Sequence, residues 1–116
     1  MNIDALISGF KALGQPTRLH IIRLLAEQDL CVCELTEVLQ TSQPRISQHL
    51  KVLKNAGLVK ESIEGSMRIY HLQKTNLENY FSSFNSFLSE PTSDDVTMNT
   101  YLNSLKNLDD NYRFTK

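Results

Sequence analysis

Two cysteines, Cys31 and Cys33, are the residues whose type and spacing could most directly do chemistry. A secreted disulfide scaffold would need more cysteines at wider spacing. In an intracellular chain, cysteines separated by one residue indicate soft-metal binding or redox chemistry, because thiolates bind thiophilic ions and form disulfides. Two small buried apolar residues are the alternative interpretation. The cysteine count alone leaves these interpretations open.

The second candidate for chemistry is the polar face of residues 42–56. Their apolar positions recur at helical spacing, which predicts a helix with one buried side: Ile46, Leu50 and Leu53. The opposite side carries Gln43, Arg45, Ser47, Gln48, Lys51 and Lys54. Arginine and glutamine can bind guanine and adenine edges in the major groove, and serine and lysine suit phosphates. Taken alone, such a face is more often a solvated helix surface.

A hairpin follows this helix. The apolar period changes to two, which predicts strands at residues 58–63 and 67–72 joined by the turn Glu64-Gly65-Ser66. Lys60 and Arg68 lie on either side of the turn, where they could reach the DNA backbone or minor groove. They could also be charged strand edges that discourage aggregation.

The charge distribution separates this region from the rest of the chain. The 116 residues include 12 basic and 13 acidic ones, a formal net charge of -1, which by itself argues against nucleic-acid binding. Residues 41–74, however, hold six basic and two acidic residues, a net charge of +4, between segments of −2 and −3. This basic block coincides with the predicted helix and hairpin, so the charge favours DNA contact.

Apolar periodicity also predicts the elements that position these residues. Beyond a short extended piece at residues 29–32, we expect helices at 3–13, 16–28, 33–40 and 77–88. A short helix, a tight turn and a second helix make a helix-turn-helix, and the hairpin makes it a winged helix. The predicted fold class is therefore mainly α (α+β), a winged helix-turn-helix with a two-stranded antiparallel wing. We expect one domain over 1–90 and a polar tail over 91–116, whose apolar residues from Val96 permit one more helix.

Composition and aromatic patterning bear on location and assembly. No apolar run approaches the ~20 residues of a membrane helix, and the N-terminus lacks signal-peptide features, so we expect a cytoplasmic protein without a membrane partner. An aromatic stripe together with the first helix predicts a homodimer face, formed by Leu6, Phe10, Tyr80, Phe81, Phe84 and Phe87. A two-fold dimer would place its two DNA-reading helices about 34–36 Å apart.

The motifs resemble the ArsR/SmtB family of metal-responsive repressors, in particular its arsenite-responsive branch. The resemblance covers about residues 5–72 and rests on three stretches: Asp-Leu-Cys-Val-Cys-Glu-Leu-Thr at 29–36, Ser-Gln-Pro-Arg-Ile-Ser-Gln-His-Leu at 42–50, and residues 53–58. It implies a homodimeric repressor that binds double-stranded operator DNA of a resistance operon. The same resemblance implies release when As(III) or Sb(III), the inducer, binds Cys31 and Cys33. The DNA-binding stretch that it implies contains Ser42, Gln43, Arg45, Ser47, Gln48 and His49, to which we add Lys51, Lys60 and Arg68.

One position departs from the branch's pattern. Thr36 occupies the place of a third cysteine, and a hydroxyl is a hard, weak ligand for a thiophilic ion, so we expect weaker or less selective binding with solvent or a small thiol in the third place. On a regular helix, residues two apart point about 200° apart. Cys31 and Cys33 could then share one ion only at an irregular or distorted helix start, and binding would distort the support of the DNA-reading helix. We also expect a helix N-terminus to lower the pKa of Cys33.

Two alternatives remain open. The same fold could respond to oxidation or to another soft metal, since a disulfide across one residue would be strained and easily reduced. A small thiol enzyme or metal carrier is the more distant alternative. A redox enzyme prefers Cys-x-x-Cys, and the sequence shows no nucleophile–base–orienter set, so we do not expect an enzyme.

Overall fold

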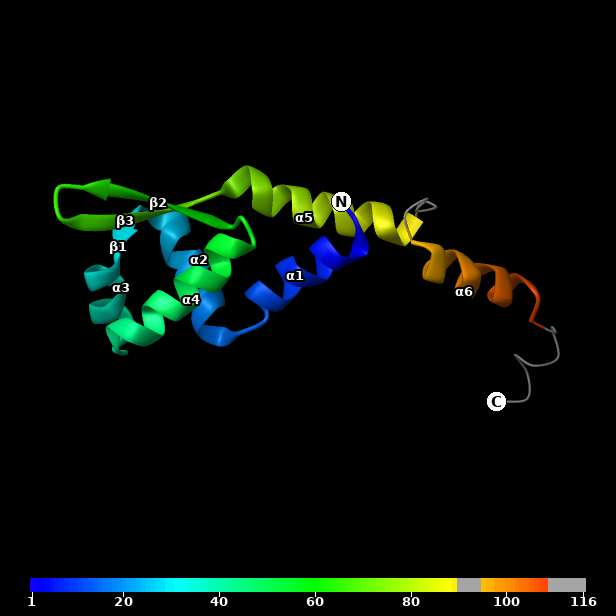
Figure 1. The fold of residues 1–116 in the computed structure, drawn as a ribbon, viewed down its shortest axis with the longest axis horizontal. Coiled ribbons are helices and arrows are strands. Elements are labelled where there is room, and N and C mark those ends of the chain that lie inside the picture. Colours follow the sequence, from blue (N-terminus) through cyan, green and yellow to red (C-terminus); the bar gives the residue numbers. More distant parts are fainter. Residues whose placement is uncertain (90–94, 109–116) are drawn as a thin grey trace.

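A computed structural model describes residues 1–89 and 95–108. Its elements are α1 (Ile3–Leu13), α2 (Pro16–Glu27), β1 (Leu30–Cys31), α3 (Val32–Leu39), α4 (Gln43–Asn55), β2 (Val59–Glu64), β3 (Met67–Leu72), α5 (Lys74–Ser89) and α6 (Val96–Lys106). The β2–β3 hairpin forms one end of the molecule and α6 the other, with α1 and α5 between them (Figure 1). The predicted order of helices and hairpin is confirmed.

Local signals explain where the helices start. α2 begins with Pro16 in its first turn, where the missing N–H is not needed, and the Gln15 side chain accepts from the Arg18 N–H at 2.9 Å. α4 begins after Ser42, whose hydroxyl accepts from the Arg45 N–H at 3.4 Å. These caps satisfy backbone donors that a helix leaves without partners.

The helix-turn-helix consists of α3 and α4. α3 ends at Gln40, which has a left-handed backbone (φ 53°) and reverses the chain in a short turn before α4. On α4 the predicted apolar seam is confirmed, because Ile46, Leu50 and Leu53 are fully buried. Each such side chain contributes about 1.5–3 kcal/mol through burial. The seam therefore holds α4 in one rotational setting and turns its polar face outward.

The sheet contains one strand more than the predicted wing. β2 and β3 pair antiparallel as expected, with Gly65 (φ 63°) in the turn between them. The two-residue strand β1 adds to the other edge of β3, where Leu30 pairs with Tyr70 and Cys31 with Ile69. The sequence predicted an extended piece at this place but not its pairing partner, because two residues carry no detectable alternation. β1 thereby attaches the start of α3 to the wing.

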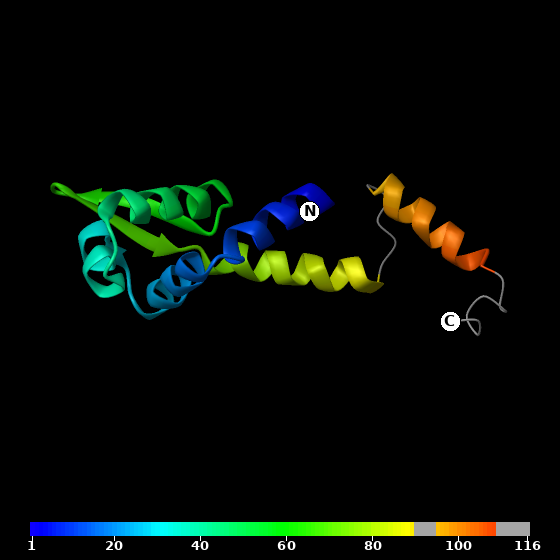
Figure 2. The same ribbon diagram turned by 90° about the horizontal axis from the view of Figure 1, so that it is seen from below.

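α1 and α5 pack at unusually close range. A Cβ built on Gly9 of α1 would lie 2.3 Å from a ring carbon of Tyr80 of α5. Tyr80 is only 7% exposed, and its hydroxyl donates to the Ala56 carbonyl, the C-cap of α4, at 2.6 Å. Figure 2 shows α5 running beside α1. Tyr80 thus connects both of these helices to the C-terminal end of α4.

The predicted tail is described in part. Residues 91–94 and 109–116, and with them the predicted domain boundary at 90, lie outside the described residues. The further helix that the apolar residues permit is present as α6, in which no residue is buried. Among the described residues, no helix is long and apolar enough to cross a bilayer.

Candidate nucleic-acid interface and thiol site

The polar face of α4 lies outward as the sequence predicts. Gln43, Arg45, Gln48 and Lys51 are exposed and Ser47 is half-buried. We call these five residues the reading face. Ser42 differs from them, because its hydroxyl caps α4 and is engaged by the Arg45 N–H. The reading face therefore combines groups suited to base edges with groups suited to phosphates.

His49 lies at the border of this face and contacts α2. Its Nδ1 is 3.3 Å from a guanidinium nitrogen of Arg18, whose Nε donates to the Ala12 carbonyl at 2.7 Å. Burial, followed by the positive charges of Arg18 and Arg45, lowers the pKa of His49. A neutral imidazole that accepts from Arg18 supports α4 against α2. The structure thus gives His49 a packing contact, and its predicted contact with DNA remains a prediction.

The wing carries a charge cluster that the sequence analysis missed. Glu61 of β2 accepts from Lys54 of α4 at 2.7 Å, from Arg68 of β3 at 3.2 Å and from the Tyr70 hydroxyl at 2.8 Å. The hydrogen bonds from Lys54 and Tyr70 lower the pKa of Glu61 to about 2. Burial and the Glu61 carboxylate raise the pKa of Tyr70 to about 12.

This cluster ties the end of α4 to both strands of the wing. Lys60 is exposed on β2, whereas the guanidinium of Arg68 is shared with Glu61. The only sequence signal for the cluster was the cross-strand pairing of Glu61 with Tyr70, which becomes visible once the hairpin register is known.

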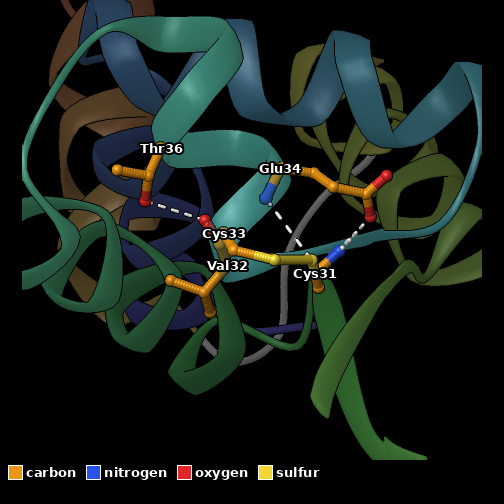
Figure 3. Close-up of a disulfide and its surroundings, with 5 residues drawn as sticks. All are labelled: Cys31, Val32, Cys33, Glu34 and Thr36. Carbon is orange, nitrogen blue, oxygen red and sulfur yellow. Dashed lines mark hydrogen bonds between the residues drawn. A yellow bond between two sulfur atoms is a disulfide. The ribbon is translucent and has the colours of Figure 1, made fainter.

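The cysteine pair lies at the junction of β1 and α3. Cys31 ends β1 and is the N-cap of α3, with an extended backbone (φ −84°, ψ 165°), whereas Cys33 is inside the first turn. Their Cα atoms are 5.4 Å apart and their sulfur atoms are joined in a disulfide (Figure 3). Cys31 is buried, at 2% exposure, and Cys33 is exposed.

This arrangement meets one of the two conditions expected for a shared ion, an irregular helix start. The 200° separation applies to two residues that are both helical, and Cys31 is not. The irregular helix start that the sequence analysis named as a condition is therefore built into the fold. In the disulfide the two sulfur atoms meet while α3 keeps its regular helix from Val32 onward.

The side-chain hydrogen bond at the N-terminus of α3 is made by Cys31. Cys31 Sγ accepts from the Glu34 N–H at 3.4 Å, and the Glu34 carboxylate accepts from the Cys31 N–H at 2.9 Å. This reciprocal pair is a capping box with sulfur in place of the usual hydroxyl oxygen. The direct contact with a helix N–H is thus made by the sulfur of Cys31, and the effect of the helix N-terminus on Cys33 stays a prediction.

A pocket of about 480 Å³ opens beside the cysteine pair. It is lined by Cys31, Val32, Cys33, Thr36, Glu37, Gln43, Ser66, Met67 and Arg68. Three parts of the fold meet there: the start of α3, the first residue of α4 and the tip of the wing. Gln43 and Arg68 belong to the predicted DNA-contacting residues and the cysteines to the predicted inducer site, and the pocket brings members of both sets together.

The Thr36 hydroxyl, at the place of a third cysteine, is engaged within α3. This hydroxyl donates to the Val32 carbonyl at 2.8 Å, one turn earlier in the helix. Within residues 1–89 and 95–108, no three His, Cys, Asp or Glu side chains gather where they could hold a metal ion. The protein therefore offers two thiol sulfurs, a donor set that fits a thiophilic ion with two protein bonds.

The predicted dimer residues divide between the core and the surface. Leu6 and Tyr80 are buried within the single chain, and Phe10 and Phe87 pack partly against the same core. Phe81 and Phe84 are 50% and 37% exposed, and the Phe84 ring meets Phe10 edge to face at a centroid distance of 5.3 Å. The surface of this region is extended by Ile3, Ile7 and Leu88, which are also exposed.

Comparison with known proteins agrees with this geometry. The profile of bacterial regulatory proteins of the arsR family matches residues 15–61. An HTH-type transcriptional regulator of Methanocaldococcus jannaschii is 50% identical over 64 residues, which span 54% of this chain and 72% of that protein. The arsenical resistance operon repressor of Escherichia coli K12 is 45% identical over 64 residues, and the match spans 54% of this chain and about half (55%) of that repressor.

A solved structure shows the same fold. The crystal structure of a possible transcriptional regulator for arsenical resistance superposes with a TM-score of 0.63 at 34% identity, over 69% of this chain and 83% of that one. The family profile covers α2 to the first residues of β2, and these matches identify a regulator of transcription rather than an enzyme, as the sequence predicted. The chain belongs to the arsR family of bacterial regulatory proteins.

Proposed function

We propose that this protein is a homodimeric repressor that binds operator DNA and leaves it when As(III) or Sb(III) binds Cys31 and Cys33. One observation carries the proposal. The convergent sulfur atoms line the same pocket as Gln43 of α4 and Ser66, Met67 and Arg68 of the wing. The name of the E. coli relative, an arsenical resistance operon repressor, supports the choice of inducer.

The pocket suggests how inducer and DNA exclude each other. DNA binding needs α4 and the wing at a set separation, since both must follow the same duplex. An ion held by Cys31 and Cys33 occupies space between these two elements and changes that separation. Inducer and DNA then favour different separations of α4 and the wing, so each lowers the affinity of the protein for the other. Such coupling free energies are commonly about 1–3 kcal/mol, or 5–150-fold in affinity.

Substitution of each cysteine tests the assignment. Operator binding is followed by fluorescence anisotropy while arsenite is added to the fully reduced protein. Cys31→Ser and Cys33→Ser keep operator affinity and lose the arsenite response. Serine is a preferred N-cap, so the first substitution leaves α3 intact. Val38→Ser, at a site on α3 that is 57% exposed, is the control for a polar change in that helix. Arsenite release that survives both cysteine substitutions overturns the proposal.

The proposed dimer interface is the apolar surface of α1 and α5. Exposed Ile7, Phe81, Phe84 and Leu88 form a face that a second copy can cover. Phe81→Glu is expected to yield monomers in analytical ultracentrifugation and to weaken operator binding, since one reading helix replaces two. A variant that stays dimeric with full affinity contradicts this placement of the interface.

A redox response is the second candidate, and the Cys31–Cys33 disulfide favours it. In that scheme a peroxide oxidises the two thiols to the disulfide and is itself reduced to water. The oxidised protein, verified by a mass loss of about two hydrogens, is then compared with the reduced protein on operator DNA. Equal affinities, together with release by arsenite, eliminate the redox scheme.

A further inference from the structure

We infer that the pocket beside the cysteine pair binds a small thiol carrying both a carboxylate and an ammonium group, and that this thiol supplies the third sulfur to the arsenic. The inference rests on the proposed function and deepens it. It adds a co-ligand to the inducer and gives a role to Glu37, Ser66 and Arg68 of the pocket, which belong neither to the reading face nor to the cysteine pair.

First, arsenic forms more bonds than the thiolates of this protein can supply. Trivalent arsenic forms three bonds, and this protein offers two thiolates to it, from Cys31 and Cys33. Thr36 lines the pocket, but its hydroxyl is engaged by the Val32 carbonyl, and a hydroxyl is a hard donor. Glu37 is also a hard donor. The remaining soft atom in the lining is the thioether of Met67, which has no proton to exchange for a bond to arsenic.

The second step is the size of the pocket. Its volume of about 480 Å³ falls within the usual range of small-molecule sites, about 300–1,000 Å³. A water molecule occupies about 30 Å³ of liquid volume. An arsenic bearing one hydroxide as its third ligand would leave most of this space to solvent, whereas a thiol of amino-acid or short-peptide size fills it.

The third step is the charge of the lining. Arg68 offers a guanidinium, which binds carboxylates through paired N–H donors, and it donates to Glu61 through one nitrogen, Nη1, at 3.2 Å. Glu37 offers a carboxylate that can bind an ammonium group. Gln43 and Ser66 add neutral hydrogen-bonding groups. Opposite charges beside two sulfurs match a zwitterionic thiol better than a neutral one.

The chemistry balances without a change in the oxidation state of arsenic. Arsenous acid and the three thiols, of Cys31, Cys33 and the co-ligand, form three As–S bonds and release three waters. The same small thiol, in excess, first reduces the Cys31–Cys33 disulfide and is itself oxidised to its own disulfide. A phosphine reductant opens the disulfide without supplying a thiol, so the two roles can be separated.

The test titrates arsenite into the full-length protein on labelled operator after phosphine reduction. Three conditions are compared: no thiol, glutathione, and 2-mercaptoethanol as a neutral thiol of equal concentration. We expect glutathione to lower the arsenite concentration for half-release about tenfold or more, and 2-mercaptoethanol to lower it much less. Capture of arsenite by glutathione in solution would shift the curve in the opposite direction. Native mass spectrometry is expected to show protein, arsenic and one glutathione together.

Three variants in the pocket and one control outside it sharpen the result. Thr36→Cys supplies a third thiolate, so it should release at low arsenite without any thiol and without a glutathione adduct. Glu37→Gln should reduce the advantage of glutathione over 2-mercaptoethanol severalfold, whereas Glu78→Gln, on α5 and outside the pocket, should not. Met67→Leu should leave the thiol dependence unchanged. If it instead abolishes arsenite binding, the thioether is the third ligand and the inference is wrong.

The two proposals fail in different ways. Release at the same arsenite concentration with and without thiol, with arsenic bound and no adduct, overturns the co-ligand and leaves the repressor function standing. Absence of release under every condition overturns the proposed inducer itself.

Discussion

Gly9 lies against the ring of Tyr80, and adding one methyl group there should destabilise the protein. In Gly9→Ala the new Cβ would be 2.3, 2.5 and 2.7 Å from three ring carbons of Tyr80. The ring cannot simply move aside, because it is buried and its hydroxyl is bound to the Ala56 carbonyl at 2.6 Å. One of the two helices, α1 or α5, must therefore shift.

The magnitude follows from three contributions. Overpacking of a filled site costs about 1–3 kcal/mol. A weakened Tyr80 hydrogen bond costs about 1 kcal/mol more. Alanine gains about 1 kcal/mol over glycine in a helix interior. The expected net effect is a loss of about 1–3 kcal/mol in the free energy of unfolding.

Urea unfolding at one fixed protein concentration measures this loss. With a slope of about 1–3 kcal/mol/M, the midpoint should fall by about 1 M while the slope stays unchanged. The fixed concentration matters because association stabilises the folded state. Ser8→Ala, an exposed change on the same helix, is the control and should be neutral or slightly stabilising.

A double-mutant cycle identifies the contact responsible. Tyr80→Leu removes the ring, so Gly9→Ala should cost much less in that background than in the natural protein. If Gly9→Ala is as stable as the natural protein, or more stable, the close approach of α1 and α5 is not as described.

Three further outcomes are expected. Arg45→Ala should weaken operator binding by about 1–3 kcal/mol and reduce discrimination between operator sequences. Lys51→Ala should weaken binding to all sequences and reduce the slope of log affinity against log salt concentration by about 1. Anisotropy across salt concentrations measures both effects. The folded pKa of Glu61, about 2, lies below the ordinary 4.5, so its stabilising contribution is complete above pH 4.5 and is lost as pH falls from 4.5 towards 2. Glu61→Gln should flatten this part of the urea-midpoint profile, and an unchanged acid limb would refute the cluster. In an absorbance titration, one tyrosine should ionise with a pKa of about 12, and Tyr70→Phe should remove that step.

The sequence by itself determined the helices, the hairpin and the basic block. Their signals are local, because burial of one helix side requires apolar residues at every third or fourth position, as at Ile46, Leu50 and Leu53. The reading face follows automatically, since fixing the buried side of α4 also fixes the opposite one. The family motif at residues 29–36 likewise marked both cysteines.

Tertiary structure decided how those residues meet. The backbone change at Cys31, from strand to N-cap, makes the two sulfurs converge, and it depends on the pairing of β1 with β3 about forty residues later. The Glu61 cluster and the contact of His49 with Arg18 arise in the same way, from elements distant in the chain. The pocket exists only where the start of α3, the first turn of α4 and the wing tip pack together. Periodicity specifies which side of each element is buried. Which side chains of other elements pack against that side depends on the packing of the whole fold.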